Sequence, residues 1–98
     1  MRDFRKYAVW NWAMELATDI YGYTANFPKE EKYGLVGQIQ RAAVSISSNI
    51  AEGASRNSEI EFVHFLEIAL GSAIELESQL IIANRIGYVE ETDITELL

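Results

Sequence analysis

The chain has 98 residues, enough for one domain with a single hydrophobic core and too few for a second domain. It contains no cysteine and no run of the roughly 18 apolar residues that a membrane span needs, so we expect a soluble, cytoplasmic protein without disulfides, thiolate metal sites or a membrane partner. Its formal net charge of −7 argues against a broad phosphate-binding surface, because non-specific affinity for nucleic acid comes mainly from clustered lysine and arginine.

The first apolar pattern predicts a helix over residues 7–25 with two adjacent apolar faces. One face comprises Val9, Ala13, Leu16, Ile20 and Tyr23, and the other comprises Trp10, Met14, Ala17 and Tyr21. Such a helix is buried on about half of its circumference, more than contact with one neighbouring helix requires. Pro28 closes it, because a proline pushes the residue before it out of the α region.

A second helix is predicted over residues 29–53. Pro28 suits the first position of this helix, and Gly53 offers the left-handed conformation that a helix C-cap prefers. Gly34 and Gly37 are poor helix formers, and together they indicate either a close approach of the backbone to a neighbour or a loose first turn, of which we prefer the second. The core face carries Leu35, Ile39, Ala42, Ala43, Ile46 and Ile50.

A third helix is predicted over residues 59–86. Ser58 and Glu61 have the spacing of a capping box, in which the serine accepts from the Glu61 amide and the glutamate reaches back. Gly87 supplies the stop. One apolar face carries Phe62, Phe65, Leu66, Ala69, Ala73, Leu76, Leu80 and Ala83, and a second, about 100° round the axis, carries Val63, Leu70, Ile74 and Ile81.

This second face exceeds what a three-helix sheaf can bury, so a fourth helix or another subunit must cover it. Residues 92–98 have the pattern of an N-cap followed by the first turns of a fourth helix. The sequence therefore predicts one all-α domain over residues 1–98, with helices at about 7–25, 29–53, 59–86 and 92–98.

A polar stripe runs beside the core face of the helix predicted over residues 29–53. Its members fall three or four residues apart, in an arc of about 80°: Gln38, Arg41, Ser45, Asn49 and Glu52. We interpret the stripe first as a polar network that joins helices, because charge networks are often structural. The alternative is the lining of a groove or pore that recognises a ligand.

The partners of this stripe can be predicted if the second and third helices are antiparallel about a turn near residue 56. Arg41 then lies within reach of the third helix, and the candidates there are Glu67, Ser72 and Glu75. Ser45 falls near Glu67, and Glu52 falls beside the turn, near Arg56.

The sequence gives little support for a catalytic site or a metal site. Glu61 and His64 match one Glu-x-x-His element of di-iron helical bundles, but such sites need two elements and two further glutamates, and the chain has one histidine. Arg56 and His64 are too far apart in sequence for the Arg and His pair of helical ribonucleases that resemble the higher-eukaryote-and-prokaryote nucleotide-binding domains. We therefore expect no enzyme activity, no cofactor and no metal.

Several segments together closely resemble the four-helix-bundle proteins of the 23S ribosomal RNA intervening-sequence family, also called S23-like. They are Phe27-Pro28 before Glu31, Tyr33-Gly34-Leu35, the run RAAVSISSNIAEG from Arg41 to Gly53, Phe65 and Ala69 with Gly71-Ser72-Ala73, Glu75-Leu76-Glu77, and Gly87-Tyr88. The resemblance implies an antiparallel up-down four-helix bundle, with a short or truncated fourth helix in this chain, that assembles as a ring-shaped homopentamer. It implies no established catalytic activity.

A branch related to that family comprises accessory proteins of diversity-generating retroelements, which work with a reverse transcriptase and bind nucleic acid through a basic surface. This chain is acidic, so the resemblance carries the fold over but not the RNA binding. Our first hypothesis is a non-catalytic homo-oligomeric scaffold or interaction module. The alternative is a nucleic-acid or nucleoprotein accessory factor, with candidate contacts at Arg2, Arg5, Lys6 and Arg85.

Overall fold

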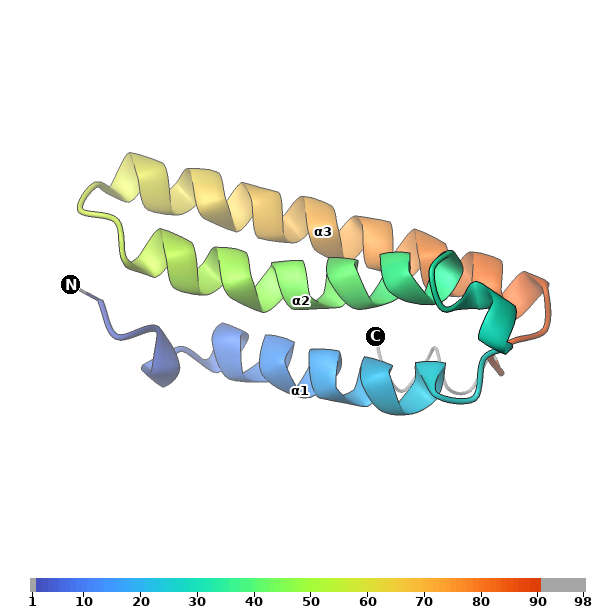
Figure 1. Ribbon diagram of the computed structural model, residues 1–98. Coiled ribbons are helices and arrows are strands. Elements are labelled where there is room, and N and C mark those ends of the chain that lie inside the picture. Colours follow the sequence, from blue (N-terminus) through green and yellow to red (C-terminus); the bar gives the residue numbers. More distant parts are fainter. Residues whose placement is uncertain (1, 91–98) are drawn as a thin grey trace.

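The computed structural model of the chain describes residues 2–90 and shows an all-α fold (Figure 1). Its helices are α1 (Ala8–Thr24), α2 (Leu35–Ala54) and α3 (Glu59–Arg85), with short 3-10 helices η1 (Phe4–Lys6) and η2 (Lys29–Glu31). No strand occurs among these residues. Consecutive helices run antiparallel, and the molecule measures 44 × 20 × 18 Å along its principal axes.

The all-α prediction is confirmed, and the bounds of α1 and α3 lie within one residue of those predicted. The predicted fourth helix at 92–98 lies outside the described residues. Residues 2–90 form three helices and not the predicted four-helix bundle. No helix in this part of the chain combines the length and the hydrophobicity that a membrane crossing requires.

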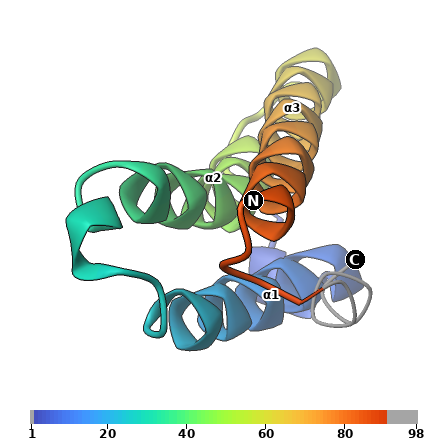
Figure 2. The ribbon, with the colours of Figure 1, turned by 90° about the vertical axis from the view of Figure 1, so that its right-hand side faces the viewer.

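Helix α2 is the centre of the fold, because the main contacts between helices are those that it makes with α1 and with α3. Viewed from one end, α1 and α3 lie on different sides of α2 (Figure 2). The core consists of aliphatic side chains from all three helices, and the largest fully buried ones are Ile20, Ile39, Ile50, Leu76 and Leu80. The apolar faces that the sequence shows in α1 and α2 therefore pack together in one core.

The start of α2 differs from the prediction. The segment after Pro28 forms η2, and α2 begins only at Leu35, not at residue 29. Gly34 has non-helical backbone angles and serves as the N-cap, while the Glu31 carboxylate accepts a hydrogen bond from the Leu35 amide at 3.4 Å. The second Glu31 oxygen accepts from the Tyr88 hydroxyl at 3.1 Å. Glu31 therefore links the segment before α2 to Tyr88, which follows α3. These two hydrogen bonds hold η2 out of the axis of α2.

The end of α2 also differs. Gly53 was predicted to stop the helix in a left-handed conformation, but α2 continues to Ala54 with Ser55 as its C-cap, and Gly53 has no positive φ. Gly53 is buried instead against α3. A Cβ there would come within 2.7 Å of Phe65 Cβ and 3.0 Å of Phe62 Cδ1. The glycine therefore permits a close approach of two helices and does not end one.

Both ends of α3 follow the local signals in the sequence. The Glu61 amide donates to Ser58 Oγ at 3.0 Å, which is one of the two bonds of the predicted capping box, and the reciprocal bond from the Ser58 amide to the Glu61 side chain does not form among residues 2–90. At the other end Gly87 has a φ of +89°. Its amide donates to the Asn84 carbonyl at 3.0 Å, and the Tyr88 amide donates to the Ala83 carbonyl at 2.9 Å. These two bonds form the Schellman motif that glycine favours after a helix.

Candidate functional site

The middle of the predicted polar stripe forms a compact cluster between α2 and α3. Ser72 Oγ donates to Ser45 Oγ at 2.9 Å. Asn49 Nδ2 donates to the Ser45 carbonyl at 2.8 Å and to Ser45 Oγ at 2.9 Å. The three side chains are half-buried, so the hydrogen bonds satisfy polar groups that the helix interface partly removes from water.

The register of this cluster corrects the predicted pairing. Ser45 was expected near Glu67 and instead meets Ser72, five residues further along α3. The turn itself lies between Ala54 and Glu59, close to the predicted residue 56, so the shift comes from how the two helices pack and not from the position of the turn. Glu67 is exposed, and Glu75 accepts from Gln79 Nε2 at 3.1 Å.

Arg41 does not join the cluster. Its side chain is exposed, and among residues 2–90 it makes no hydrogen bond or ion pair. One of its guanidinium nitrogens, Nη1, lies over Gly37, 3.1 Å from the position that a Cβ would take. Gln38, at the start of the stripe, is exposed as well. The stripe is thus divided between a helix joint at Ser45 and Asn49 and an open surface around Arg41.

The other end of the stripe belongs to the turn between α2 and α3. Glu52 and Arg56 form an ion pair, and the Arg56 guanidinium lies over the Phe65 ring, 4.8 Å from its centre. Arg2 Nη1 donates to the Arg56 carbonyl at 2.7 Å, and the Arg2 guanidinium lies 4.6 Å from the centre of the Phe62 ring. Arg2 therefore ties the N-terminal segment to this turn.

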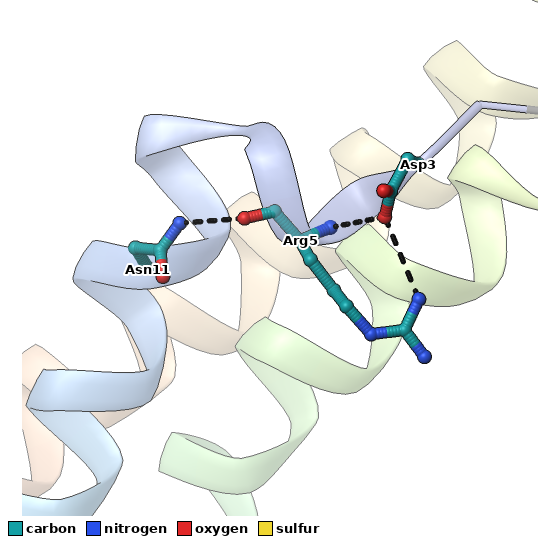
Figure 3. A network of polar contacts seen from close by, with 3 residues as sticks. All are labelled: Asp3, Arg5 and Asn11. Carbon is teal, nitrogen blue, oxygen red and sulfur yellow. Dashed lines mark hydrogen bonds and ion pairs between the residues drawn. The ribbon is translucent and has the colours of Figure 1, made fainter.

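The four cations considered as nucleic-acid contacts are not brought together. Arg5 is held at the start of the chain, where its amide and its Nη1 donate to Asp3 Oδ1 at 3.1 and 3.5 Å (Figure 3). Asn11 Nδ2 donates to the Arg5 carbonyl at 3.0 Å. Lys6 is exposed nearby, whereas Arg85 lies in the last turn of α3, at the opposite end of the molecule (Figure 1).

A groove on the outer side of α2 brings together residues that belong to different predicted segments of the chain. It has a volume of about 640 Å³ and is lined by Tyr21 of α1, Lys32 and Tyr33 of the connection, and Gly37, Gln40 and Arg41 among the residues of α2. Its lining includes two cations and no carboxylate.

His64 is exposed on α3, and its ring packs edge-on against Phe65 with ring centres 5.9 Å apart. No group of three or more His, Cys, Asp or Glu side chains with the geometry of a metal site occurs within residues 2–90.

The second apolar face of α3 is exposed in the part of the chain that the structure describes. Four of its predicted members are exposed: Val63 (51%), Leu70 (62%), Ile74 (60%) and Ile81 (40%). Ile60, in the first turn of α3, continues the same line and is 85% exposed. The face predicted to pack inward is buried or half-buried along its whole length. We call the five exposed residues the α3 stripe.

The sequence profile of the 23S rRNA-intervening sequence protein family matches residues 5–98. The chain belongs to this family. A crystal structure of an S23 ribosomal protein family member of unknown function from Bacteroides thetaiotaomicron is similar to it in sequence and fold. The two chains are 28% identical, the match covers 92% of this chain and 84% of the other, and the TM-score is 0.81. No curated protein sequence matches this chain.

For this member of the intervening-sequence family, sequence reasoning identified Arg41 as a candidate binding residue but missed its neighbours in the groove. Tyr21 reads as part of an apolar helix face, and Lys32 and Tyr33 read as the first turn of a helix. Their convergence depends on the packing of α1 against α2 and on the late start of α2, neither of which is visible in the periodicity.

Proposed function

We propose that this family member is a non-catalytic helical scaffold that assembles with copies of itself through the α3 stripe. The observation that carries the proposal is the exposure of five large aliphatic side chains on one face of one helix, where Glu67 is the charged residue between Val63 and Leu70. Soluble monomers rarely leave a contiguous apolar surface of this kind, and when they do it usually marks an interaction site.

The energetic case rests on the length of the stripe. From Ile60 to Ile81 an α-helix spans about 32 Å, and burial of each isoleucine or leucine side chain is worth about 1.5 to 3 kcal/mol. The same helix in a second copy of the chain presents an apolar surface of equal length.

The number of subunits comes from the family resemblance, which leads us to expect five. The proposal assigns no catalytic role and no cofactor, because the sequence contains no constellation of nucleophile, base or metal ligands. The polar cluster of Ser45, Asn49 and Ser72 serves in this proposal to fix the register of α3 against α2, so that the α3 stripe is presented in one orientation.

Light scattering coupled to size-exclusion chromatography tests the assembly. At micromolar concentration we expect a defined oligomer of about five subunits, and a clean monomer would falsify the proposal. Ile74→Glu places a carboxylate in the middle of the α3 stripe and should dissociate the oligomer, since burying an unpaired charge is strongly unfavourable.

Ile68→Glu is the matched control, because Ile68 is also exposed on α3 (40%) and lies about 120° round the helix axis from Ile74. It should leave the oligomer intact. Equal dissociation by both variants, with helicity retained in circular dichroism, would show that the α3 stripe has no special part in assembly.

A further inference from the structure

The groove on the outer side of α2 carries positive charge in an acidic protein. The chain has a net charge of −7, yet Lys32 and Arg41 line this groove without a carboxylate among the lining residues. By contrast, Arg5 and Arg56 form ion pairs with Asp3 and Glu52. In a chain with 15 acidic residues, two cations that share a groove free of acidic groups point to an anionic ligand.

The acidic residues closest in sequence are directed elsewhere. Glu31 precedes Lys32, but one of its carboxylate oxygens accepts from the Leu35 amide and the other from the Tyr88 hydroxyl. The hydrogen bond to Glu31, partial burial and the negative charges of Glu31 and Glu30 raise the pKa of Tyr88. The Glu31 carboxylate is therefore engaged by partners outside the groove, and no carboxylate lines the groove itself.

The backbone of α2 makes room for the guanidinium. Gly37 lies one turn before Arg41, and a Cβ there would stand 3.1 Å from Arg41 Nη1 and 3.3 Å from the Lys32 carbonyl oxygen. Glycine at this position lets the Arg41 side chain lie back along the helix toward Lys32. The two cations thus reach the same hollow from different elements, one from the helix and one from the preceding connection.

Two aromatic rings border the same hollow. Tyr33 is 86% exposed and Tyr21 is 51% exposed, and they come from the connection and from α1. Lys32 Nζ lies 5.3 Å from the centre of the Tyr33 ring, so the cation and the ring face act on one region. Such rings are sequence-tolerant surfaces for stacking of a nucleobase, whereas a simple anion or an acidic peptide would need only the cations.

We propose that this groove binds a nucleoside phosphate, with the phosphate between Lys32 and Arg41 and the base against Tyr33. Arg41 supplies paired N–H donors for phosphate oxygens and Lys32 supplies a point charge. Gln40, which also lines the groove and donates to Thr24 Oγ1 at 3.1 Å, is held at the wall beside α1. The nucleoside phosphate can be a free nucleotide or one unit of a single-stranded nucleic acid.

Titration of the ¹⁵N-labelled protein, followed by NMR, tests the site with three probes: AMP, inorganic phosphate and a single-stranded pentanucleotide. We expect the Gly37 amide and Arg41 Nε–H signals to shift, and AMP to bind about tenfold more tightly than inorganic phosphate because of base stacking. A pentanucleotide that binds more tightly than AMP, with a log–log salt slope of about −0.7 for one neutralised phosphate, identifies the strand as the source. AMP that binds at least as tightly as the pentanucleotide identifies the free nucleotide.

Substitutions of the groove residues test whether AMP binds in the groove. Arg41→Gln should weaken AMP binding by about tenfold or more through loss of charge-assisted hydrogen bonds. Arg5→Gln makes the same change of charge at the far end of the molecule and should leave the affinity unchanged. Tyr33→Ala should reduce the affinity for AMP to that for inorganic phosphate, while Tyr33→Phe, which keeps the ring, should retain it. Arg41 and Tyr33 are exposed, so all these variants should fold as the parent does.

Three results would overturn the proposal. They are no binding of AMP or the pentanucleotide at millimolar concentration, equal losses in Arg41→Gln and Arg5→Gln, or an acidic peptide that occupies the groove in an Arg41-dependent way while AMP does not. The groove and the α3 stripe lie on different helices, so the site does not depend on the proposed assembly. Repeating the titration with Ile74→Glu separates a failure of one proposal from a failure of the other.

Discussion

Two glycines of α2 show how differently the two faces of this helix are used. Gly53 faces α3 and is buried under Phe62 and Phe65, whereas Gly37 lies under the exposed Arg41 side chain. The two positions are about 160° apart around the helix axis, and neither has a positive φ. Both therefore act through the absence of a side chain and not through backbone freedom.

The two glycines differ in which group occupies the space that a side chain would fill. At Gly53 the space is filled by a neighbouring helix, which cannot move without disturbing the core. At Gly37 it is filled by the end of a long, exposed arginine, which can move at little cost. The same residue type thus supports stability on the inner face and the geometry of the proposed binding groove on the outer face.

The largest expected effect is that of Gly53→Ala. The new Cβ would overlap Phe65 Cβ at 2.7 Å, and such overpacking costs about 1 to 3 kcal/mol, more than the roughly 1 kcal/mol that alanine gains in helix propensity. Thermal and urea unfolding should show a net loss of stability. Gly71→Ala is the matched control, because a Cβ at that helical position meets nothing within 4 Å, and it should stabilise the protein. A more stable Gly53→Ala protein would contradict the close approach of α2 and α3.

Loss of the hydrogen bond between Ser45 of α2 and Ser72 of α3 should have the next largest effect on stability. Ser45→Ala removes the acceptor of both Ser72 and Asn49, and we expect it to lower the free energy of unfolding by about 0.5 to 1.5 kcal/mol. A double-mutant cycle with Ser72→Ala measures the coupling. Strictly additive losses would show that the two serines do not interact.

Gly37→Ala should change the stability of the protein less than the two preceding substitutions do, and it should weaken the binding of AMP. Its gain in helix propensity of about 1 kcal/mol is offset by the tight contact with the Lys32 carbonyl at 3.3 Å, so the melting temperature should move little. The Cβ displaces the Arg41 guanidinium, so AMP binding in the NMR titration should weaken. Unchanged binding would show that the position of Arg41 over Gly37 is unimportant for the groove.

The smallest expected effect concerns pH. The hydrogen bond to Glu31 and the negative charges around it raise the pKa of Tyr88 above its ordinary value of 10.0. The stabilisation is therefore fully present below pH 10 and is lost as the pH rises through the raised pKa. Tyr88→Phe should melt slightly lower than the parent at pH 8, and the difference should shrink above pH 10. A constant difference across this range would contradict the role of the Tyr88 hydroxyl.

Much of the local structure follows from short segments of sequence. Ser58 with Glu61 and Gly87 predicted the two ends of α3 because caps and C-terminal glycines act over a few residues. The surplus apolar face of α3 was also predictable, since helical periodicity alone separates Leu70 and Ile74 from the core face. Gly53 was misread, because a glycine near a helix end gives the same local signal whether it caps the helix or admits a neighbour.

The sequence by itself determined that this protein is all-α, where α1 and α3 begin and end, and that α3 has a second apolar face beyond the one that packs against α2. These properties depend on backbone conformation and on periodicity within one element. Only the tertiary structure decided that Ser45 meets Ser72, that Arg41 stands apart from the carboxylates of α3, and that Tyr21 joins Lys32 and Arg41 around one groove. The physical reason is that these contacts depend on the register and separation of packed helices, which even a single Cβ at Gly53 would change.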